Sequence, residues 1–191
     1  MATPSLVRNA RRTSRLSQKT LSARSGVAAS SLSLIESGKR VPTLETVERL
    51  LRFSGHSLVT IATRRENAAA IASRISEAEL AGRTDLALRH FIQLNDNLAA
   101  ERNELRYALA ITEPASTGVK HWDAAIAGLV AYRLAEEGFP PPSWTVRKER
   151  TLGKSWTLSG GRYTAPVDRQ RVPQQFLDRG VLVDADTLLS A

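Results

Sequence analysis

Cysteine is absent from this chain of 191 residues, and histidine occurs only three times. Without thiols, a disulfide framework and a thiolate metal site are both excluded. The histidines, His56, His90 and His121, lie far apart and lack the spacing of metal ligands. We therefore expect no metal site and no other cofactor.

Long apolar runs are missing as well. Residues 1–8 contain no apolar run of the length that a secretory signal peptide needs. No stretch approaches the roughly 20 apolar residues that cross a bilayer. The sequence therefore predicts a cytoplasmic protein with no membrane partner.

The motifs of common enzymes are also absent: the chain has no phosphate-binding Gly-rich loop, nucleophile elbow, HExxH or paired-carboxylate motif. His121 and Asp123 come nearest to a catalytic pair, but side chains two positions apart on a helix point away from each other. Asp123 is better interpreted as an acidic residue near the positive end of a helix. We expect a chain that is not an enzyme.

Acidic residues are scarce in the first third of the chain. Residues 1–65 hold 12 Lys or Arg and 3 Asp or Glu, a net charge of +9, whereas residues 66–191 hold 15 basic and 16 acidic residues, a net charge of −1. A basic region attracts polyanions and releases their counterions. The division of charge favours two domains, over residues 1–65 and 66–191, with a polyanionic partner for the first.

The most informative stretch is residues 16–38, which predicts two short helices joined by a tight turn. Ser17 can cap the first helix with its side-chain oxygen, and Gly26 can end it in a left-handed conformation. Leu32 and Ile35 then lie three apart on one face of the second helix. This pattern is typical of a helix-turn-helix, whose second helix enters the major groove of DNA.

Apolar periodicity predicts that most of the remaining chain is helical. Thr43 and Thr84 are predicted to cap helices. Leu44 and Leu80 are predicted to face the core. In the helix-turn-helix itself, Ala23 is small enough for a close helix crossing. The further helices are expected over residues 5–14, 44–53, most of 66–110 with a break near 82–84, and 122–137.

Two segments are predicted to form short strands. Residues 56–63 are rich in β-branched side chains and need a pairing partner, from a homodimer mate or from the C-terminal region; a helical continuation is the alternative. Residues 180–183 favour a buried strand, followed by a terminal turn over residues 186–189.

The most specific motifs of the chain are Leu16-Ser17-Gln18, Leu21, Ala23, Ser25-Gly26-Val27, the run from Leu32 to Lys39, Pro42 and Leu44. Through these motifs, residues 5–58 resemble the phage repressor/Cro-type (XRE) helix-turn-helix domain. The resemblance implies a repressor-like domain of five helices, so that the fold class is mainly α, with a mainly helical C-terminal domain that contains a few short strands. It also implies a transcriptional regulator that binds double-stranded DNA. We expect a homodimer, with residues 66–191 as the dimerisation and partner-binding domain.

The resemblance also assigns the DNA-binding residues. In that family the first residues of the second helix face the bases; here the matching positions are small, so we expect sequence selection to depend partly on DNA shape. Gln18 matches a position that grips a phosphate, and the loop after the helix is placed for contacts with the DNA backbone. The alternative for the serines is a capping or solvated hydroxyl, and for the loop simple solvation. The candidates are Gln18, Ala29, Ser30, Ser31, Ser33, Leu34, Lys39 and Arg40.

Arg11 and Glu36 match a family pair that bridges the first helix and the end of the second helix of the motif. We interpret this pair as structural.

The C-terminal part contains a series of motifs that run from Thr117-Gly118 and Trp122-Asp123-Ala124-Ala125 through Pro142-Ser143-Trp144, Trp156 and Pro166 to Arg179-Gly180-Val181. Through these motifs it is similar to XRE-type proteins thought to act as antitoxin-like partners of nucleotidyltransferase-type toxins. This second resemblance implies a cognate toxin and repression of the chain's own promoter. Trp144 and Trp156 are candidate anchors for the partner because tryptophan is enriched among binding hot spots, with core packing as the alternative. The alternatives to an antitoxin are a plain XRE-type repressor without a toxin, or a protein-interaction module that has lost DNA binding.

Overall fold

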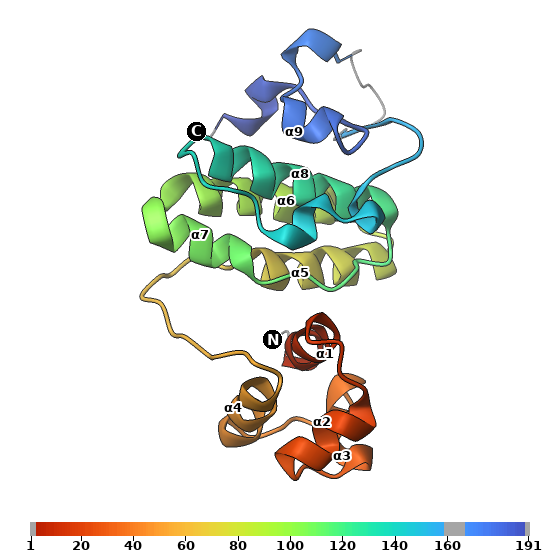
Figure 1. Cartoon of the computed structure of the whole chain (residues 1–191). Helices are drawn as coiled ribbons and strands as arrows, with labels where there is room; N and C mark the ends of the chain where they lie inside the picture. Colours follow the sequence, from red (N-terminus) through yellow and green to blue (C-terminus); the bar gives the residue numbers. More distant parts are fainter. Residues whose placement is uncertain (1–2, 159–166, 190–191) are drawn as a thin grey trace. The chain divides into compact units, whose positions relative to one another are not determined.

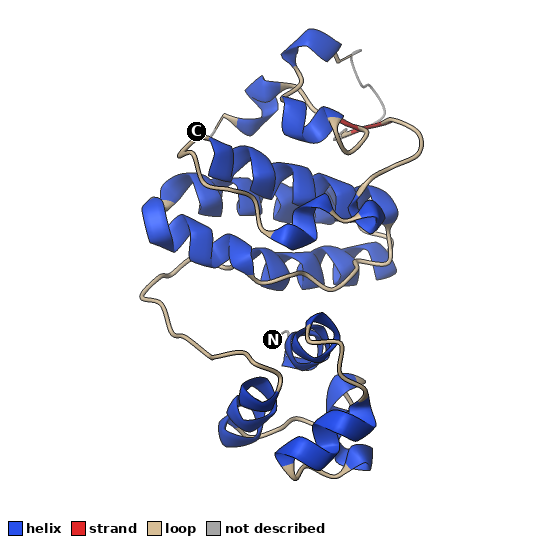
Figure 2. Cartoon of the chain, in the orientation of Figure 1, coloured by secondary structure: helices blue, strands red, loops and turns tan. Residues whose placement is uncertain are grey.

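The computed structural model describes residues 3–158 and 167–189. The chain divides into two compact units, residues 1–62 and 63–191, so the boundary lies three residues before the one expected from charge. Each unit has its own cluster of buried apolar side chains. Both units are mainly helical, which confirms the expected fold class (Figures 1 and 2).

In the part of the N-terminal unit that the structure describes there are four helices (Figure 1): α1 (Thr3–Thr13), α2 (Gln18–Ser25), α3 (Ala29–Glu36) and α4 (Leu44–Phe53). Helix α1 packs on α3 and α4, and α2 packs on the same two helices. The predicted helices are therefore confirmed, with ends that differ by one or two residues. The core consists of Val7, Ala10, Leu21, Val27, Leu32, Ile35, Val47, Leu50 and Leu51.

The turn between α2 and α3 forms as the residue types predict. The Oγ of Ser17 accepts a hydrogen bond from the backbone N–H of Thr20 at 3.0 Å, which caps α2. Gly26 ends the helix with a φ of +70°, a conformation that costs glycine little, and its N–H donates to the carbonyl of Ser22 at 3.0 Å. Thr43 caps α4 in the same way, with its Oγ1 3.3 Å from the N–H of Thr46.

The segment after α4 differs from both predictions. Residues 56–63 form neither a strand nor a continuation of the helix, so the described part of this unit has four helices rather than five. Val59 is 75% exposed. Its β-branched neighbours favour an extended backbone, but a strand also needs a second strand beside it, and the described residues of this unit provide none. Leu44 and Ala23, which were expected to pack, are exposed as well.

The described residues of the C-terminal unit form five helices and several short elements. The helices are α5 (Ala68–Leu80), α6 (Thr84–Ala100), α7 (Asn103–Ile111), α8 (Lys120–Ala135) and α9 (Gln174–Leu177). Single turns of 3-10 helix lie at Ser143–Val146, Lys148–Arg150, Arg169–Arg171 and Ala185–Leu188. Strands β1 (Trp156–Thr157) and β2 (Val181–Leu182) pair in parallel, with Trp156 opposite Val181.

Helix α8 lies at the centre of this unit and is buried on nearly all sides. Helices α5, α6 and α7 contact it, as do α9, β2 and the first two 3-10 turns (Figure 1). Gly128 lets the ring of Phe176 on α9 pack closely against α8, because a Cβ at position 128 would lie 2.7 Å from Cδ1 of Phe176. The central helix therefore depends on a glycine where an aromatic ring crosses it.

Some predictions for this unit are confirmed and others are wrong. The break near residues 82–84, the strand at β2 and the terminal turn are present. Thr84, however, does not cap α6, since the cap position belongs to Arg83, which makes no side-chain capping bond. Leu80 is 86% exposed instead of facing the core, because it is the last residue of α5.

Candidate nucleic-acid interface

Helix α3 has one buried face and one exposed face. Leu32 and Ile35 point into the core with at most 2% exposure. Ser30, Ser33 and Leu34 share the opposite face, since they are three and four positions apart, and all are exposed; Leu34 is 41% exposed. Ala29 is exposed at the start of the helix, and Ser31 is half-buried. The candidate base-contacting residues therefore lie mainly on the free face of α3.

A buried carboxylate holds the C-terminal end of α3. Glu36 is 3% exposed and accepts two hydrogen bonds from Arg11 on α1, from Nε at 2.7 Å and from Nη2 at 2.8 Å. The same guanidinium donates to the carbonyl of Leu16 at 2.9 Å. Paired bonds of this kind fix orientation as well as distance. The predicted bridge between α1 and the end of α3 is thus present in the geometry.

Electrostatics keep this pair charged. Burial alone would raise the pKa of the Glu36 carboxyl, but the hydrogen bonds from Arg11 and Gln18 outweigh it and hold that pKa below its ordinary value. The hydrogen bond from Arg11 to Glu36 raises the pKa of Arg11 in turn. An ion pair therefore ties α1 to α3 at neutral pH.

Two further side chains join this group. Gln18, at the start of α2, donates from Nε2 to Glu36 Oε2 at 2.9 Å. Arg8 donates from Nη2 to the backbone carbonyl of Glu36, one of the carbonyls at the end of α3 that have no partner within the helix. We call Arg8, Arg11, Gln18 and Glu36 the Glu36 network; it joins α1, α2 and α3.

Sequence reasoning anticipated only part of this network. Gln18 was expected to grip a DNA phosphate, and that contact stays a prediction, while the structure gives its amide a role inside the protein. The contact of Arg8 was missed. Its position three residues before Arg11 places both side chains on the same face of α1, and this spacing was the available signal.

The basic loop after α3 lies close against that helix. The backbone N–H groups of Lys39 and Arg40 both donate to the carbonyl of Leu34, at 2.9 and 3.1 Å. Arg40 Nη1 also donates to Ser31 Oγ at 2.8 Å. The side chains of Lys39 and Arg40 are exposed. Two cations are therefore held beside the free face of α3, where the phosphates that flank a bound groove would lie.

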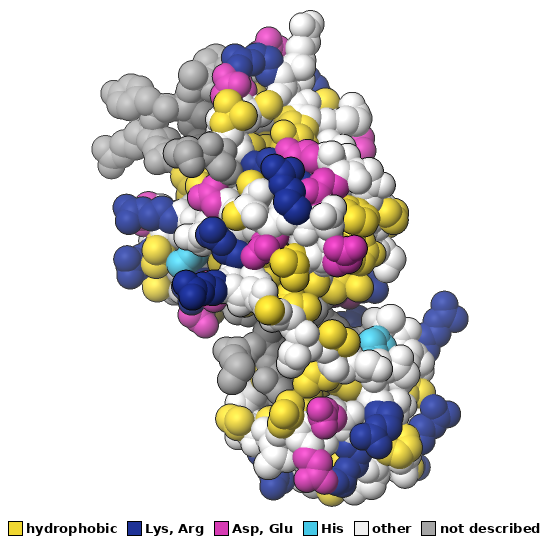
Figure 3. Space-filling model, turned by 90° about the vertical axis from the view of Figure 1, so that its left-hand side faces the viewer, with side chains coloured by type: hydrophobic (Ala, Val, Ile, Leu, Met, Phe, Trp, Pro, Cys, Tyr) yellow, Lys and Arg dark blue, Asp and Glu magenta, His cyan; other side chains and the backbone are white. Residues whose placement is uncertain are grey.

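The N-terminal unit is strongly basic as a whole. Residues 1–62 hold 10 Lys or Arg and 3 Asp or Glu, a net charge of +7. One of the acidic residues, Glu36, is buried and paired, and Glu45 forms an ion pair with Arg49 at 2.9 Å. Figure 3 shows Lys and Arg side chains projecting from the surface of the molecule. Such a surface attracts a polyanion.

The two candidate partner anchors have different surroundings. Trp144 is 3% exposed, and its indole N–H donates to the carbonyl of Ala110 at 3.1 Å, so it belongs to the core and is not available as a surface anchor in this structure. Trp156 is half-buried and stacks on His121, with ring centroids 4.2 Å apart. Only Trp156 presents part of its ring at the surface.

The His121 and Asp123 side chains have structural partners. Asp123 accepts hydrogen bonds from Ser116 Oγ at 2.6 Å and from the backbone N–H of Thr117 at 2.8 Å, which fixes the loop that leads into α8. Burial lowers the pKa of His121 from its ordinary value.

No group of three or more His, Asp or Glu side chains in the described residues is arranged to hold a metal ion. Over the same residues, no helix is both long enough and apolar enough to cross a membrane.

Comparison with known families agrees with this geometry. Residues 5–66 match a family model described as a helix-turn-helix domain, which includes all of α2, α3 and α4. The chain has an N-terminal helix-turn-helix domain. That domain suggests a DNA-binding regulator. The match covers less than half of the chain, and the comparisons with curated proteins and with solved structures found no match.

Proposed function

We propose that the chain is a non-enzymatic, sequence-specific transcriptional regulator of the XRE type that binds duplex DNA as a homodimer at a palindromic site in its own promoter. The observation that carries this proposal is the free face of α3 beside two exposed cations, Lys39 and Arg40. In helix-turn-helix dimers, two such helices reach successive half-sites about one turn of DNA apart.

The residue types on α3 determine the kind of recognition we propose. The methyl groups of Ala29 and Leu34 can contact the methyl group of thymine, and the hydroxyls of Ser30 and Ser33 can bond to base edges. None of these side chains makes the bidentate contacts of Arg, Asn or Gln. Part of the selection therefore comes from DNA shape and deformability.

A salt titration tests the electrostatic part of this proposal. Each phosphate contact contributes about −0.9 to the slope of log K against log salt. We expect Lys39→Ala with Arg40→Ala to weaken binding to all duplex sequences and to make the slope less steep by about 1.8. The measurement is fluorescence anisotropy on a duplex from the promoter at several salt concentrations.

A matched control removes two exposed cations from the C-terminal unit, Lys148→Ala with Arg169→Ala, and should leave the slope unchanged. Equal slopes for the two double variants would show that the loop after α3 does not contact phosphate. Salt-insensitive binding, or no binding at all, would instead favour an interaction module that has lost DNA binding.

We propose further that the chain is an antitoxin whose C-terminal unit binds a cognate toxin of the nucleotidyltransferase type. The support is the resemblance of residues 117–181 and the presence of a separate C-terminal unit, which DNA docking does not require. Trp156 is the remaining aromatic candidate for this interface, because part of its ring is exposed. A plain repressor without a toxin is the alternative.

Co-expression with the product of the neighbouring gene tests the antitoxin proposal. We expect the neighbour to arrest growth when expressed alone, and the chain to restore growth and to co-purify with it. Trp156→Ala should weaken co-purification while Lys39→Ala with Arg40→Ala should not. A harmless neighbour that never co-purifies would contradict the antitoxin role and leave a plain repressor.

A further inference from the structure

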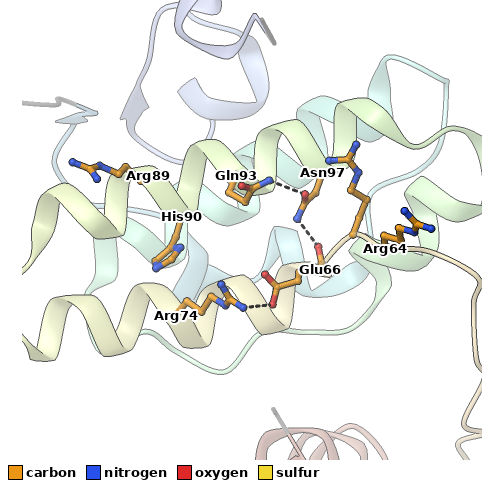
Figure 4. Close-up of a pocket in the computed structure, with 8 residues that line it drawn as sticks. Arg64, Glu66, Arg74, Arg89, His90, Gln93 and Asn97 are labelled. Carbon is orange, nitrogen blue, oxygen red and sulfur yellow. Dashed lines mark hydrogen bonds and ion pairs between the residues drawn. The ribbon is translucent and has the colours of Figure 1, made fainter.

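The C-terminal unit contains an open pocket between α5, α6 and the segment that precedes α5. Its volume is about 370 Å³. Four arginines line it, Arg64, Arg65, Arg74 and Arg89, together with the polar side chains of His90 and Asn97 (Figure 4). We call this the arginine pocket; the DNA-binding role proposed above does not use it.

The chain that carries Arg64 and Arg65 is fastened to the C-terminal unit. Thr63 Oγ1 donates to Glu101 Oε1 at 2.7 Å, just beyond the end of α6. Asn97 Nδ2 donates to the backbone carbonyl of Glu66 at 3.0 Å, and this Asn97 side chain is buried (Figure 4). The two arginines therefore lie between two points of attachment.

The pocket has an excess of positive charge, since its lining contains four arginines but one carboxylate, that of Glu66. Glu66 pairs with Arg74 at 2.9 Å, and Arg89 lies 3.6 Å from Asp85. Within the described residues, the guanidinium groups of Arg64 and Arg65 make no hydrogen bond or ion pair. Residues 63–191 hold 17 basic and 16 acidic residues, so this concentration of arginine is local.

The wall formed by α6 is polar. His90, Gln93 and Asn97 lie on one face of that helix, and Gln93 Nε2 donates to Asn97 Oδ1 at 3.0 Å. Burial, followed by the charge of Arg74, lowers the pKa of His90 from its ordinary value, while Glu66 acts in the opposite direction. Planar guanidinium groups match the oxygen geometry of phosphate and can bind it through two parallel hydrogen bonds.

We propose that the arginine pocket binds the phosphate groups of a small phosphorylated molecule, with Arg64 and Arg65 as its principal ligands. The concave shape and a volume within the range of small-molecule sites favour a compact ligand over a duplex, which presents its phosphates on a convex surface. Arg64 and Arg65 belong to the first residues of the C-terminal unit, which begins at Thr63.

Isothermal titration calorimetry of the full chain with inorganic pyrophosphate tests the proposal. We expect one pyrophosphate per chain at this pocket and a loss of affinity of about tenfold or more in Arg64→Gln with Arg65→Gln, since hydrogen bonds to charged groups are strong. Neither side chain has a partner in the described residues, so this variant should fold normally. Lys154→Gln with Arg169→Gln removes the same charge elsewhere in the unit and should bind as the unchanged chain does.

A second set of binding measurements distinguishes a small phosphorylated ligand from the phosphates of duplex DNA. Duplex DNA should bind the Arg64→Gln, Arg65→Gln variant with little change, and Lys39→Ala with Arg40→Ala should leave pyrophosphate binding intact. No pyrophosphate binding by the unchanged chain, or equal affinities for the two Gln double variants, overturns the proposal. A loss of DNA affinity with unchanged pyrophosphate affinity also overturns it, since the arginines would then serve the duplex.

Discussion

Replacing Glu36 by alanine is expected to destabilise the N-terminal unit by about 3 kcal/mol or more, the cost typical of removing one partner from a buried ion pair. The variant leaves the guanidinium of Arg11 and the amide of Gln18 without their acceptor, in a region where Glu36 is 3% exposed. The end of α3 then loses its tie to α1 and α2. Binding to DNA should fall with it, because α3 carries the proposed reading face.

The positions of the tryptophans allow the stability of the two units to be followed separately. The three tryptophans, Trp122, Trp144 and Trp156, all belong to the C-terminal unit. Hydrogen exchange should show lost protection in α1 to α4 of Glu36→Ala, while the tryptophan fluorescence transition in urea stays unchanged. Glu45→Ala is the matched control: it breaks an exposed i,i+4 pair with Arg49, for which we expect less than about 1 kcal/mol. Equal protection in the two variants would contradict a stabilising role for the Glu36 network.

Replacing Arg106 by methionine is expected to have an effect of similar size in the other unit. Arg106 is 1% exposed, and its guanidinium donates to the carbonyls of Glu101 at 2.9 Å and Arg133 at 2.7 Å, and to Glu136 Oε2 at 2.9 Å. These carbonyls belong to the ends of α6 and α8, where backbone groups lack partners within their helix. Methionine keeps much of the volume but supplies no donor, so about 3 kcal/mol should be lost.

Tryptophan fluorescence in urea reports this loss directly. With a slope of about 1–3 kcal/mol per molar urea, the midpoint should fall by about 1 M or more. Arg102→Met is the control, since that arginine is 71% exposed and lies 3.5 Å from Glu137. Protection of α1 to α4 should persist in both variants. A midpoint for Arg106→Met that matches Arg102→Met would show that the buried cation does not stabilise the unit.

Local sequence signals predicted the helix-turn-helix well. Ser17, Gly26 and Thr43 act through bonds to residues close to them in the chain, so their residue types indicate the caps directly. The strand expected over residues 56–63 failed because pairing depends on a distant segment, which composition does not reveal.

The parts of the structure that sequence reasoning missed depend on tertiary contacts. Arg8 and Arg106 both bind backbone carbonyls of other helices, and charge in a sequence pattern does not distinguish a buried arginine from a solvated one. The arginine pocket was missed for the same reason, since Arg74 and Arg89 lie on different helices that meet only after folding. Trp144 is buried, and its indole N–H donates to a backbone carbonyl from a distant helix, a contact that the sequence does not reveal.

The central claim is that the free face of α3 selects the DNA sequence, and selection from a pool of random duplexes tests it most directly. The full chain and the variant Ser30→Ala, Ser31→Ala, Leu34→Ala would be used to select duplexes under identical salt conditions. All three substitutions lie outside the core of the unit, so the fold should persist. We predict that the full chain enriches a palindromic motif and that the triple variant enriches an altered or weaker one, since a good base contact is worth about 1–3 kcal/mol and a serine contact less. Identical motifs from the two proteins would contradict the assignment of α3 as the reading helix.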